Sequence, residues 1–229
     1  HGVIYGIALS SLILIIIFYK EIKLYKIDFS LLKQKKEFLF NNHALNVIST
    51  FRKDIDKILI VPLFGFTLLG NFALSLQFFA ILMIFANISF KYLLPKDIEG
   101  DQNKKLKKLL ILFSILISLL GYFTSPFLIE NFFSQYSESI IPIQIISFAV
   151  IPTTITMILS AKILSLEKSR YLIIGTVAQL ITIVLGVITL GTLFGIIGIA
   201  FSFLLSNSIN AIILSIFNFM YIGKKKFEI

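Results

Sequence analysis

A dense cluster of charges is followed directly by a long apolar run in residues 52–90, RKDIDKILIVPLFGFTLLGNFALSLQFFAILMIFANISF. Five of the six residues from Arg52 to Lys57 are charged, and the 33 residues of 58–90 include no Asp, Glu, Lys or Arg. A helix needs about 20 apolar residues to cross the hydrocarbon core of a bilayer. The run is therefore too short for two crossings, and the fold depends on where the charges lie relative to the membrane.

The composition of the whole chain is that of a membrane protein. Only 14% of its residues are charged and 57% are hydrophobic, whereas soluble domains carry about 25% charged residues. A second run, 171–222, is also free of charged residues. We predict an all-α polytopic membrane protein. There are no cysteines, and the net charge of +9 indicates contact with anionic membrane lipids rather than with nucleic acid.

Basic residues alternate with apolar segments along the chain. The loops at 65–69, 127–140 and 192–194 have no Lys or Arg, and their only charges are Glu130 and Glu138. Because cytoplasmic loops are enriched in Lys and Arg, we expect the basic loops and the C-terminus to be cytoplasmic, in a multi-pass protein of the plasma membrane. The expected spans number about seven: 3–19, 38–64, 70–94, 107–126, 141–164, 170–191 and 195–221. They give a single helix at 1–19, a basic cytoplasmic linker at 20–37, a six-helix lobe at 38–222 and a basic cytoplasmic tail at 223–229.

This topology places the charge cluster inside the membrane. The basic loops before Phe38 and after Phe90 lie on one side, so the chain between them must cross an even number of times. The first crossing must then begin near Phe38 and turn at Gly65–Asn71, which puts Arg52–Lys57 about 12 to 20 Å from the turn at about 1.5 Å per residue. The alternative is that the cluster ends an interfacial amphipathic helix over 31–51.

Charged side chains inside a membrane avoid lipid and face a bundle interior or an aqueous cavity. Two oppositely charged pairs have helical spacing, Arg52 with Asp56 and Asp54 with Lys57, and the cluster keeps one net positive charge. Polar residues precede it and extend a polar stripe toward the cytoplasm: Asn41, Asn42, His43, Asn46, Ser49 and Thr50. The candidate cavity residues are therefore Arg52, Lys53, Asp54, Asp56, Lys57, Asn46 and His43.

Signatures of enzymes are missing from the sequence. It has no G-x-x-x-x-G-K-[ST], H-E-x-x-H or G-x-S-x-G motif and no set of metal ligands at a typical spacing, so we expect no catalytic residues, no metal and no cofactor. Further polar residues within the spans are expected to form interhelical hydrogen bonds, and some to line a cavity. They are Asn71, Gln77, Asn87, Gln144, Thr153, Thr154, Thr156, Gln179, Asn207 and Asn210.

Three stretches resemble the polysaccharide flippases of the MOP (multidrug/oligosaccharidyl-lipid/polysaccharide) exporter superfamily. The family's seventh and eighth helices typically have an Asp, a Leu-Gly-x-aromatic turn and a closing Pro. Here these match Asp56, Leu69-Gly70-Asn71-Phe72, where Asn-Phe departs from the usual pair, and Pro95. FGIIGIAFSFLLSN (194–207) resembles the family's entry to its last helix. Phe133-Ser134-Gln135-Tyr136 is a looser version of its Phe-Gly-x-x-Tyr outer loop.

The resemblance covers nearly the whole chain but only the C-terminal half of the family. It implies that 3–19 is the sixth helix and that 38–221 is one six-helix lobe of a two-lobed, MATE-like transporter whose N-terminal lobe is missing here. Such proteins are understood to move a polyprenyl-pyrophosphate-linked oligosaccharide across the membrane by alternating access, with cavity cations on the pyrophosphate. Arg52, Lys53 and Lys57 would suit that role, and Asp54 and Asp56 would hold them or bind a coupling ion.

Three other functions stay open. A drug or metabolite exporter of the same superfamily would favour acidic cavity residues over the basic excess of 52–57. A membrane enzyme of lipid-linked sugar metabolism would have to use Glu130 and Glu138, the only acids of the outer loops. A scaffold protein is the remaining possibility if the chain works as a single lobe.

The half-transporter interpretation predicts the coding sequence upstream of His1. If the chain is the C-terminal half of a longer protein, the reading frame should stay open through about five more hydrophobic segments of about 20 residues each. Sequencing the gene tests this directly. A start codon immediately upstream of His1 would contradict it and favour a single lobe.

Overall fold

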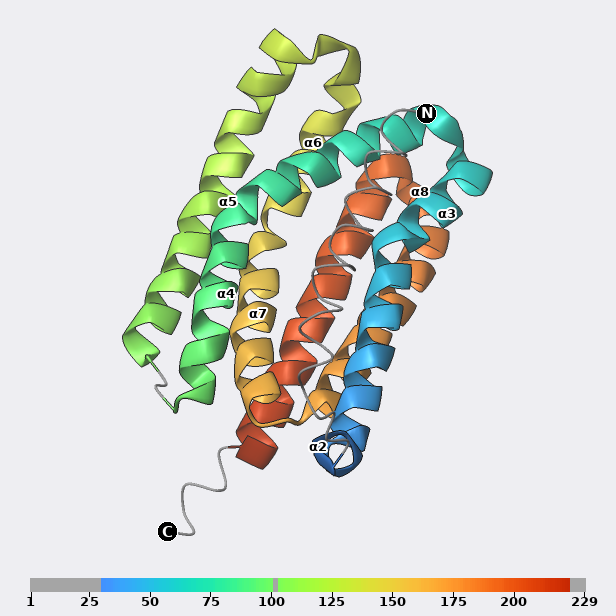
Figure 1. Ribbon diagram of the computed structural model, residues 1–229. Coiled ribbons are helices and arrows are strands. Elements are labelled where there is room, and N and C mark those ends of the chain that lie inside the picture. The colour runs from blue at the N-terminus through green and yellow to red at the C-terminus, as the bar shows by residue number, and fades with distance from the viewer. Residues whose placement is uncertain (1–29, 101–102, 223–229) are drawn as a thin grey trace, which may run out of the picture. The chain divides into compact units, whose positions relative to one another are not determined.

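The computed structural model describes residues 30–100 and 103–222 (Figure 1). The expected span 3–19, most of the linker and the tail 223–229 lie outside these residues. The chain divides into two compact units, His1–Leu39 and Phe40–Ile229. In the first unit the structure describes only α2 (Ser30–Gln34) and the start of α3. The second unit contains the candidate site and is described from here on.

Every described element is helical, and no strand occurs in the part of the chain that the structure covers. This confirms the all-α prediction. The helices after α2 are α3 (Lys36–Leu82), α4 (Ile84–Ile98), α5 (Lys104–Phe132), η1 (Ser134–Ser139), α6 (Ile140–Ser147), α7 (Val150–Ser165), α8 (Ser169–Phe217) and the π-helical η2 (Asn218–Ile222).

Two glycines divide the longest helices into antiparallel arms. Gly65 in α3 has φ 83° and ψ 176°, and Gly195 in α8 has φ 59° and ψ −137°. Only glycine adopts such conformations readily, and the chain reverses at both (Figure 1). The first arms are 36–64 and 169–194, and the second arms are 66–82 and 196–217. Both turns fall where the sequence predicted them, although the helix resumes directly after each glycine.

The remaining breaks bend the chain without reversing it. The second arm of α3 continues into α4, because Met83 donates to the carbonyl of Phe79 and Asn87 donates to that of Met83, both at 2.9 Å. The pair formed by 134–147 and α7 is bent by 42° at Phe148–Ala149. Pro152 cannot donate to the carbonyl of Phe148, which explains a bend at this point.

Helix α5 extends past Pro126, where the sequence analysis ended a span. A proline leaves the carbonyl four residues earlier without its helical donor. Here that carbonyl belongs to Tyr122, and it accepts from the Ser125 hydroxyl at 3.1 Å and from the Gln144 amide at 3.4 Å. Such replacement donors allow prolines inside membrane helices, so the helix continues to Phe132.

Three described stretches are long and apolar enough to cross a membrane: Ile58–Leu82, Lys104–Phe132 and Ser169–Met220. The bent pair of 134–147 and α7 is a fourth candidate. These lengths disregard the reversals at Gly65 and Gly195, which divide two of the three stretches. The helices are those of a membrane protein, and the number of about seven spans stays a prediction.

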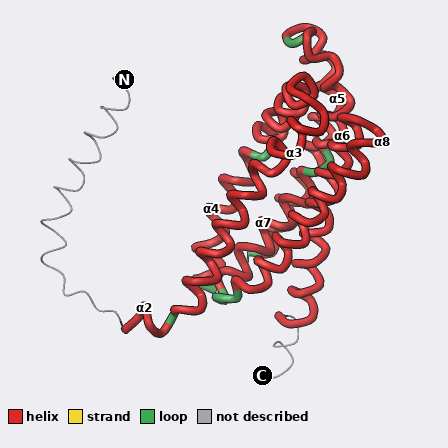
Figure 2. The backbone as a smooth tube through the Cα atoms, turned by 90° about the vertical axis from the view of Figure 1, so that its right-hand side faces the viewer, coloured by secondary structure: helices red, strands yellow, loops and turns green. Residues whose placement is uncertain are grey.

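Small side chains bring the helices close together. Helix α4 packs on α7, α5 packs on α6 and α7, and both α6 and α7 pack on α8, and Figure 2 shows these helices side by side from a second direction. The buried face of α5 includes Ser114, Ser118, Gly121 and Ser125. A Cβ on Gly121 would lie 2.6 Å from the Ser147 hydroxyl. Close approach through small residues is the usual packing mode of membrane helices.

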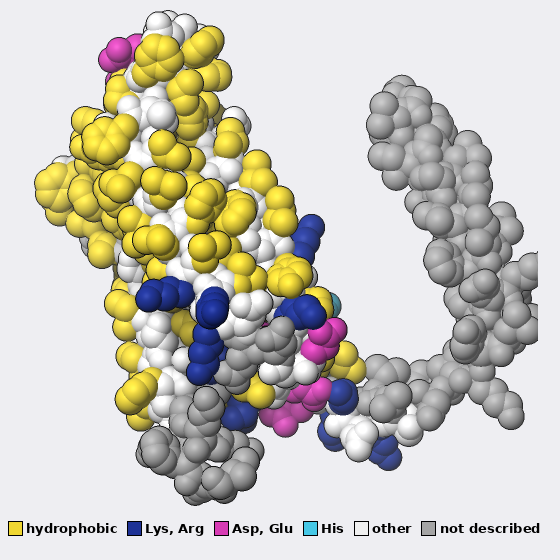
Figure 3. Space-filling view, turned by 90° about the vertical axis from the view of Figure 1, so that its left-hand side faces the viewer, with side chains coloured by type: hydrophobic (Ala, Val, Ile, Leu, Met, Phe, Trp, Pro, Cys, Tyr) yellow, Lys and Arg dark blue, Asp and Glu magenta, His cyan; other side chains and the backbone are white. Residues whose placement is uncertain are grey.

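Charge is segregated to one end of the bundle. In Figure 3, Lys and Arg side chains gather at the lower end, hydrophobic side chains cover the middle, and only acidic charges are visible at the top. At the lower end Lys107 pairs with the buried carboxylate of Asp97, and Lys96 pairs with Glu99 at 3.1 Å. The Lys and Arg side chains of the visible face therefore gather toward one end, and the rest of that face is mainly hydrophobic.

The turn of α8 depends on glycine at position 198 as well as at 195. A Cβ on Gly198 would lie 1.9 Å from the backbone carbonyl oxygen of Leu190, so Gly198→Ala should force the two arms apart. We expect a loss of about 1–3 kcal/mol, the usual cost of overpacking, measured as a lower melting temperature of the purified protein in detergent.

Gly70→Ala is the matched control. Gly70 is also helical, and its nearest neighbour would be a ring carbon of Tyr136 at 3.9 Å. Alanine has the higher helix propensity by about 1 kcal/mol, so this change should be neutral or slightly stabilising. Equal melting temperatures for the two variants would show that the arms do not approach as closely as described.

Candidate functional site

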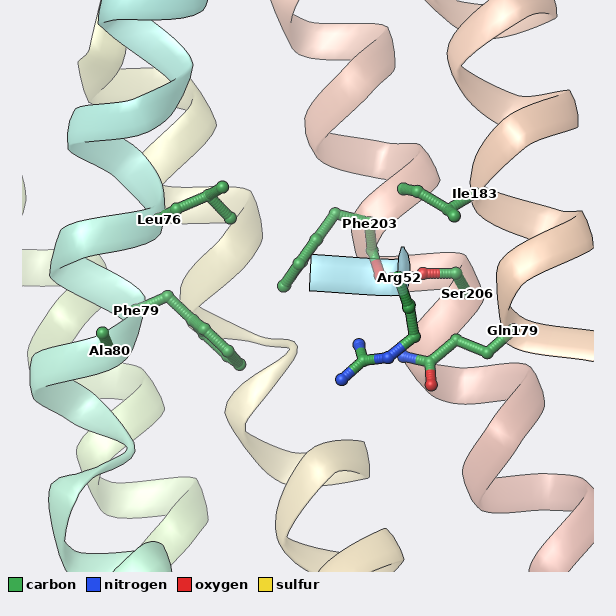
Figure 4. A pocket seen from close by; sticks show the side chains of 8 residues that line it. All are labelled: Arg52, Leu76, Phe79, Ala80, Gln179, Ile183, Phe203 and Ser206. Carbon is green, nitrogen blue, oxygen red and sulfur yellow. Dashed lines mark hydrogen bonds between the residues drawn. The ribbon is translucent and has the colours of Figure 1, made fainter. Parts of the chain in front are cut away.

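A cavity of about 340 Å³ lies between the arms of α3 and α8. Figure 4 shows the Arg52 side chain entering this space, with Phe79 on one side and Gln179 and Ser206 on the other. Each of the four arms contributes to the wall. The lining residues are Arg52, Leu76, Phe79, Ala80, Gln179, Ile183, Phe203 and Ser206.

Arg52 reaches the cavity because it lies on the inward face of the first arm of α3. Ile55 and Leu59, three and seven residues further along, lie on the same helical face and pack on the core cluster that includes Ile60 and Phe72. Arg52 is itself half-buried. Packing of its neighbours therefore directs the guanidinium toward α8.

Three of the other predicted cavity residues lie on faces of the helix that differ from the face of Arg52. His43, Asn46 and Asp54 are exposed, and each lies roughly 120–200° around the helix from Arg52 at about 3.6 residues per turn. The backbone of Lys53, Asp56 and Lys57 is helical, but their side chains lie outside the described residues. Of the seven predicted cavity residues, the structure thus describes Arg52 alone as lining this cavity.

The predicted polar stripe divides between two faces of the helix. His43, Asn46 and Thr50 are exposed, and the Thr50 hydroxyl donates back to the carbonyl of Asn46 at 2.9 Å. Asn41, Asn42 and Ser49 are half-buried, as Arg52 is. Polar groups therefore lie on both sides of the first arm rather than in one row.

The charge cluster lies within an unbroken helix. Helix α3 runs from Lys36 through residues 52–57 to Gly65 without non-helical backbone. Arg52 precedes Gly65 by 13 residues, or about 20 Å at about 1.5 Å per residue. No break separates the cluster from the helix before residue 51, and the depth of the cluster in a membrane stays a prediction.

A network of buried amides fixes one wall of the cavity. The Gln179 side-chain nitrogen donates to Asn207 Oδ1 at 2.9 Å, and its oxygen accepts from Asn210 Nδ2 at 2.8 Å. The Thr153 hydroxyl lies 3.1 Å from Asn207 Oδ1 and 2.7 Å from the carbonyl of Ala149, so its single proton is shared between these two acceptors. These bonds connect α7 with both arms of α8 and confirm the predicted interhelical hydrogen bonds for these four residues.

Sequence reasoning included Gln179 only among the many polar residues of the spans and did not single out Ser206. A signal for Ser206 exists in the sequence, since Phe203, Ser206, Asn207 and Asn210 have the spacing of one helical face. Three of these residues are polar within an otherwise apolar run. Nothing in the sequence, however, places this face opposite Arg52.

A second polar contact joins segments far apart in the chain at the end of the bundle without basic residues. Asn71 Nδ2 donates to Glu138 at 3.2 Å. The Ser139 hydroxyl lies 3.0 Å from both the carbonyl and the side-chain oxygen of Asn71, and its single proton is shared between these two acceptors. Tyr136 lies against Gly70. The stretches 69–72 and 133–139 therefore meet at this end.

Comparisons of the chain with protein-family models, with curated proteins and with solved structures found no match.

The amide network should show energetic coupling between Gln179 and Asn207. Asn207→Leu leaves the Gln179 amide nitrogen without its acceptor, and Gln179→Leu leaves Asn210 without its acceptor. The double variant should lose less stability than the sum of the singles, by about 0.6–1.7 kcal/mol, the range measured for interhelical bonds in membranes. Unfolding of the purified protein in bicelles measures the cycle.

Gln77→Leu with Asn87→Leu serves as the control cycle. These residues are of the same types, but both are exposed, so their effects should be small and additive. Additive losses for Gln179 and Asn207 as well would contradict the network.

Proposed function

We propose that this chain is part of a flippase that moves a polyprenyl-pyrophosphate-linked oligosaccharide across the plasma membrane. The observation that carries the proposal is the position of Arg52, whose side chain lines a largely apolar cavity inside an all-helical bundle. Burying a guanidinium among apolar helices is costly, and such residues usually mark a substrate path. A pyrophosphate suits this position because phosphate oxygens form strong, charge-assisted hydrogen bonds with arginine.

The arrangement of the passes supports the same class. We infer that the arms of α3 and α8, together with α5 and the bent pair of 134–147 and α7, all cross the membrane and form one lobe of a two-lobed transporter. In this orientation the basic end and the C-terminus face the cytoplasm. The glycine turns and η1 face the opposite side.

The contacts between the motif-bearing stretches also support the resemblance to the flippase family. Gly70 and Asn71 belong to its Leu-Gly-x-aromatic turn, and Tyr136 belongs to its outer loop. The two stretches meet in space, since Tyr136 lies against Gly70 and Asn71 donates to Glu138 next to the outer-loop motif.

A drug or metabolite exporter of the same superfamily is the second candidate, and the size of the cavity favours it. A volume of about 340 Å³ is within the range of small-molecule pockets. The positive charge of Arg52 argues against cationic drugs as the substrate of such an exporter.

The charge of the cluster should be essential for export. In the natural gene product that includes this chain, the double change Arg52→Gln, Lys53→Gln should abolish surface glycan and cause lipid-linked precursor to accumulate, with normal protein levels. The physical reason is loss of the cations that contact pyrophosphate. Glycan staining, mass spectrometry of extracted lipids and immunoblotting measure these three quantities.

The double change Lys104→Gln, Lys105→Gln removes the same charge from the exposed basic end and should leave export intact. Normal export by the Arg52, Lys53 variant would refute the flippase proposal. Altered drug resistance in that variant, without any glycan defect, would favour the exporter.

A further inference from the structure

The cavity has one polar end and otherwise apolar walls. Arg52, Gln179 and Ser206 provide its polar groups. The aromatic part of the wall includes Phe79 and Phe203, whose rings meet edge to face at 5.1 Å and 82°. A ligand that matches both parts has a negatively charged head and an apolar chain directly attached to it.

Gln179 is oriented to donate a hydrogen bond to such a head. Its side-chain amide has two N–H groups and an acceptor oxygen. One N–H is bound by Asn207 and the oxygen is bound by Asn210, so the orientation of the amide is fixed at both ends. The structure describes no partner for the second N–H, and Gln179 lines the cavity, so this N–H is the group that would donate to a ligand there. The residue is 3% exposed, so water competes little for this group.

The volume restricts how much of a ligand the cavity can hold. About 340 Å³ is near the lower end of the 300–1,000 Å³ typical of small-molecule sites. It accommodates one phosphate and a few carbons of one chain. The cavity is partly open, so the remainder of a larger ligand, such as a glycan, would extend beyond these walls.

We propose that this cavity binds the phosphate and the adjoining carbons of a single-chain lipid phosphate. Arg52 and Gln179 contact the phosphate oxygens, and Phe79 and Phe203 contact the first carbons of the chain. That the chain is a polyprenyl chain rests on the proposed function, whereas the head-and-chain chemistry rests on the walls of the cavity. The site therefore recognises the junction between lipid and phosphate, which is common to carriers with any glycan.

Binding of farnesyl phosphate tests the inference. The natural gene product that includes this chain is placed in phosphatidylcholine nanodiscs and incubated with radiolabelled farnesyl phosphate. We expect saturable binding, at least tenfold weaker displacement by farnesol, and none by inorganic phosphate or dioleoyl phosphatidic acid at the same concentration. Equal displacement by farnesol would show that the phosphate is not recognised. Equal displacement by inorganic phosphate would show that the chain is not recognised. Equal displacement by phosphatidic acid would show that the site does not distinguish one chain from two.

Two variants locate the binding site. Gln179→Leu should weaken farnesyl phosphate binding about tenfold, because it removes a donor to a charged group, and Gln77→Leu is the exposed control that should bind normally. Ala80→Phe should abolish binding by filling the cavity from an exposed position that lies outside the amide network. The Ala80→Phe variant still tests the location of the site if the Gln179→Leu protein fails to fold. Normal binding by a folded Ala80→Phe protein would overturn the proposed site.

The outcomes also separate this inference from the proposed function. If Ala80→Phe abolishes farnesyl phosphate binding while the Arg52, Lys53 double variant still exports glycan, the binding site stands and the flippase proposal is refuted. A strict requirement for Arg52 and Lys53 in export, with no binding of farnesyl phosphate, would retain the flippase and refute the site.

Discussion

The close approach of the two arms of α8 is the contact on which the candidate site depends. Three glycines occur where the arms meet, and side chains or backbone of the opposite arm occupy the space that their Cβ atoms would need. Gly175 faces Asn210, Gly186 faces Ser202, and Gly198 faces the carbonyl of Leu190. Only at this separation can Gln179 on one arm bond with Asn207 and Asn210 on the other, and these bonds fix the wall opposite Arg52.

The buried amides of Gln179, Asn207 and Asn210 are polar groups in an apolar bundle, and their mutual hydrogen bonds lower the cost of burying them. An amide without a partner in an apolar medium loses several kcal/mol of hydrogen bonding, so Gln179, Asn207 and Asn210 are tolerable only as a mutually bonded group. Hydroxyls are handled locally instead, since Ser202 and Thr154 donate to carbonyls four residues earlier in their own helices. The polar side chains that line the cavity are Arg52, Gln179 and Ser206.

Much of the fold follows from residues whose effect is local. The turns at Gly65 and Gly195 were predicted because charge-free runs and basic loops allow the chain to reverse only near these points. The continuation of α5 beyond the expected span was not foreseen, because the donors that replace the one lost at Pro126 are the hydroxyl of Ser125 and the amide of Gln144. Gln144 belongs to another helix, α6, and the linear sequence does not show that its amide lies near Tyr122.

The site was predictable only in part, for a related reason. Helical spacing suffices to place Arg52 and Asp54 about 200° apart, so the separation of the cluster between two faces could have been read from the sequence. The pairing of Arg52 with Gln179 and Ser206 could not, since it requires knowing which faces of α3 and α8 lie opposite one another. The charged residue Arg52 could be selected as a candidate because it stands out in an apolar chain. The neutral amide of Gln179 lies in a charge-free run with several other polar residues, so the sequence does not distinguish it.

The two glycine turns have a consequence for how the protein meets the space beyond that end of the bundle. Nothing lies within 4 Å of the Cβ position at Gly65 or Gly195, and the helices resume immediately on both sides. Among the described residues of the second unit, the connection through η1 is the longest at this end. An antibody or protease that approached these residues would therefore find exposed backbone mainly at η1, since each glycine turn reverses the chain within a single residue.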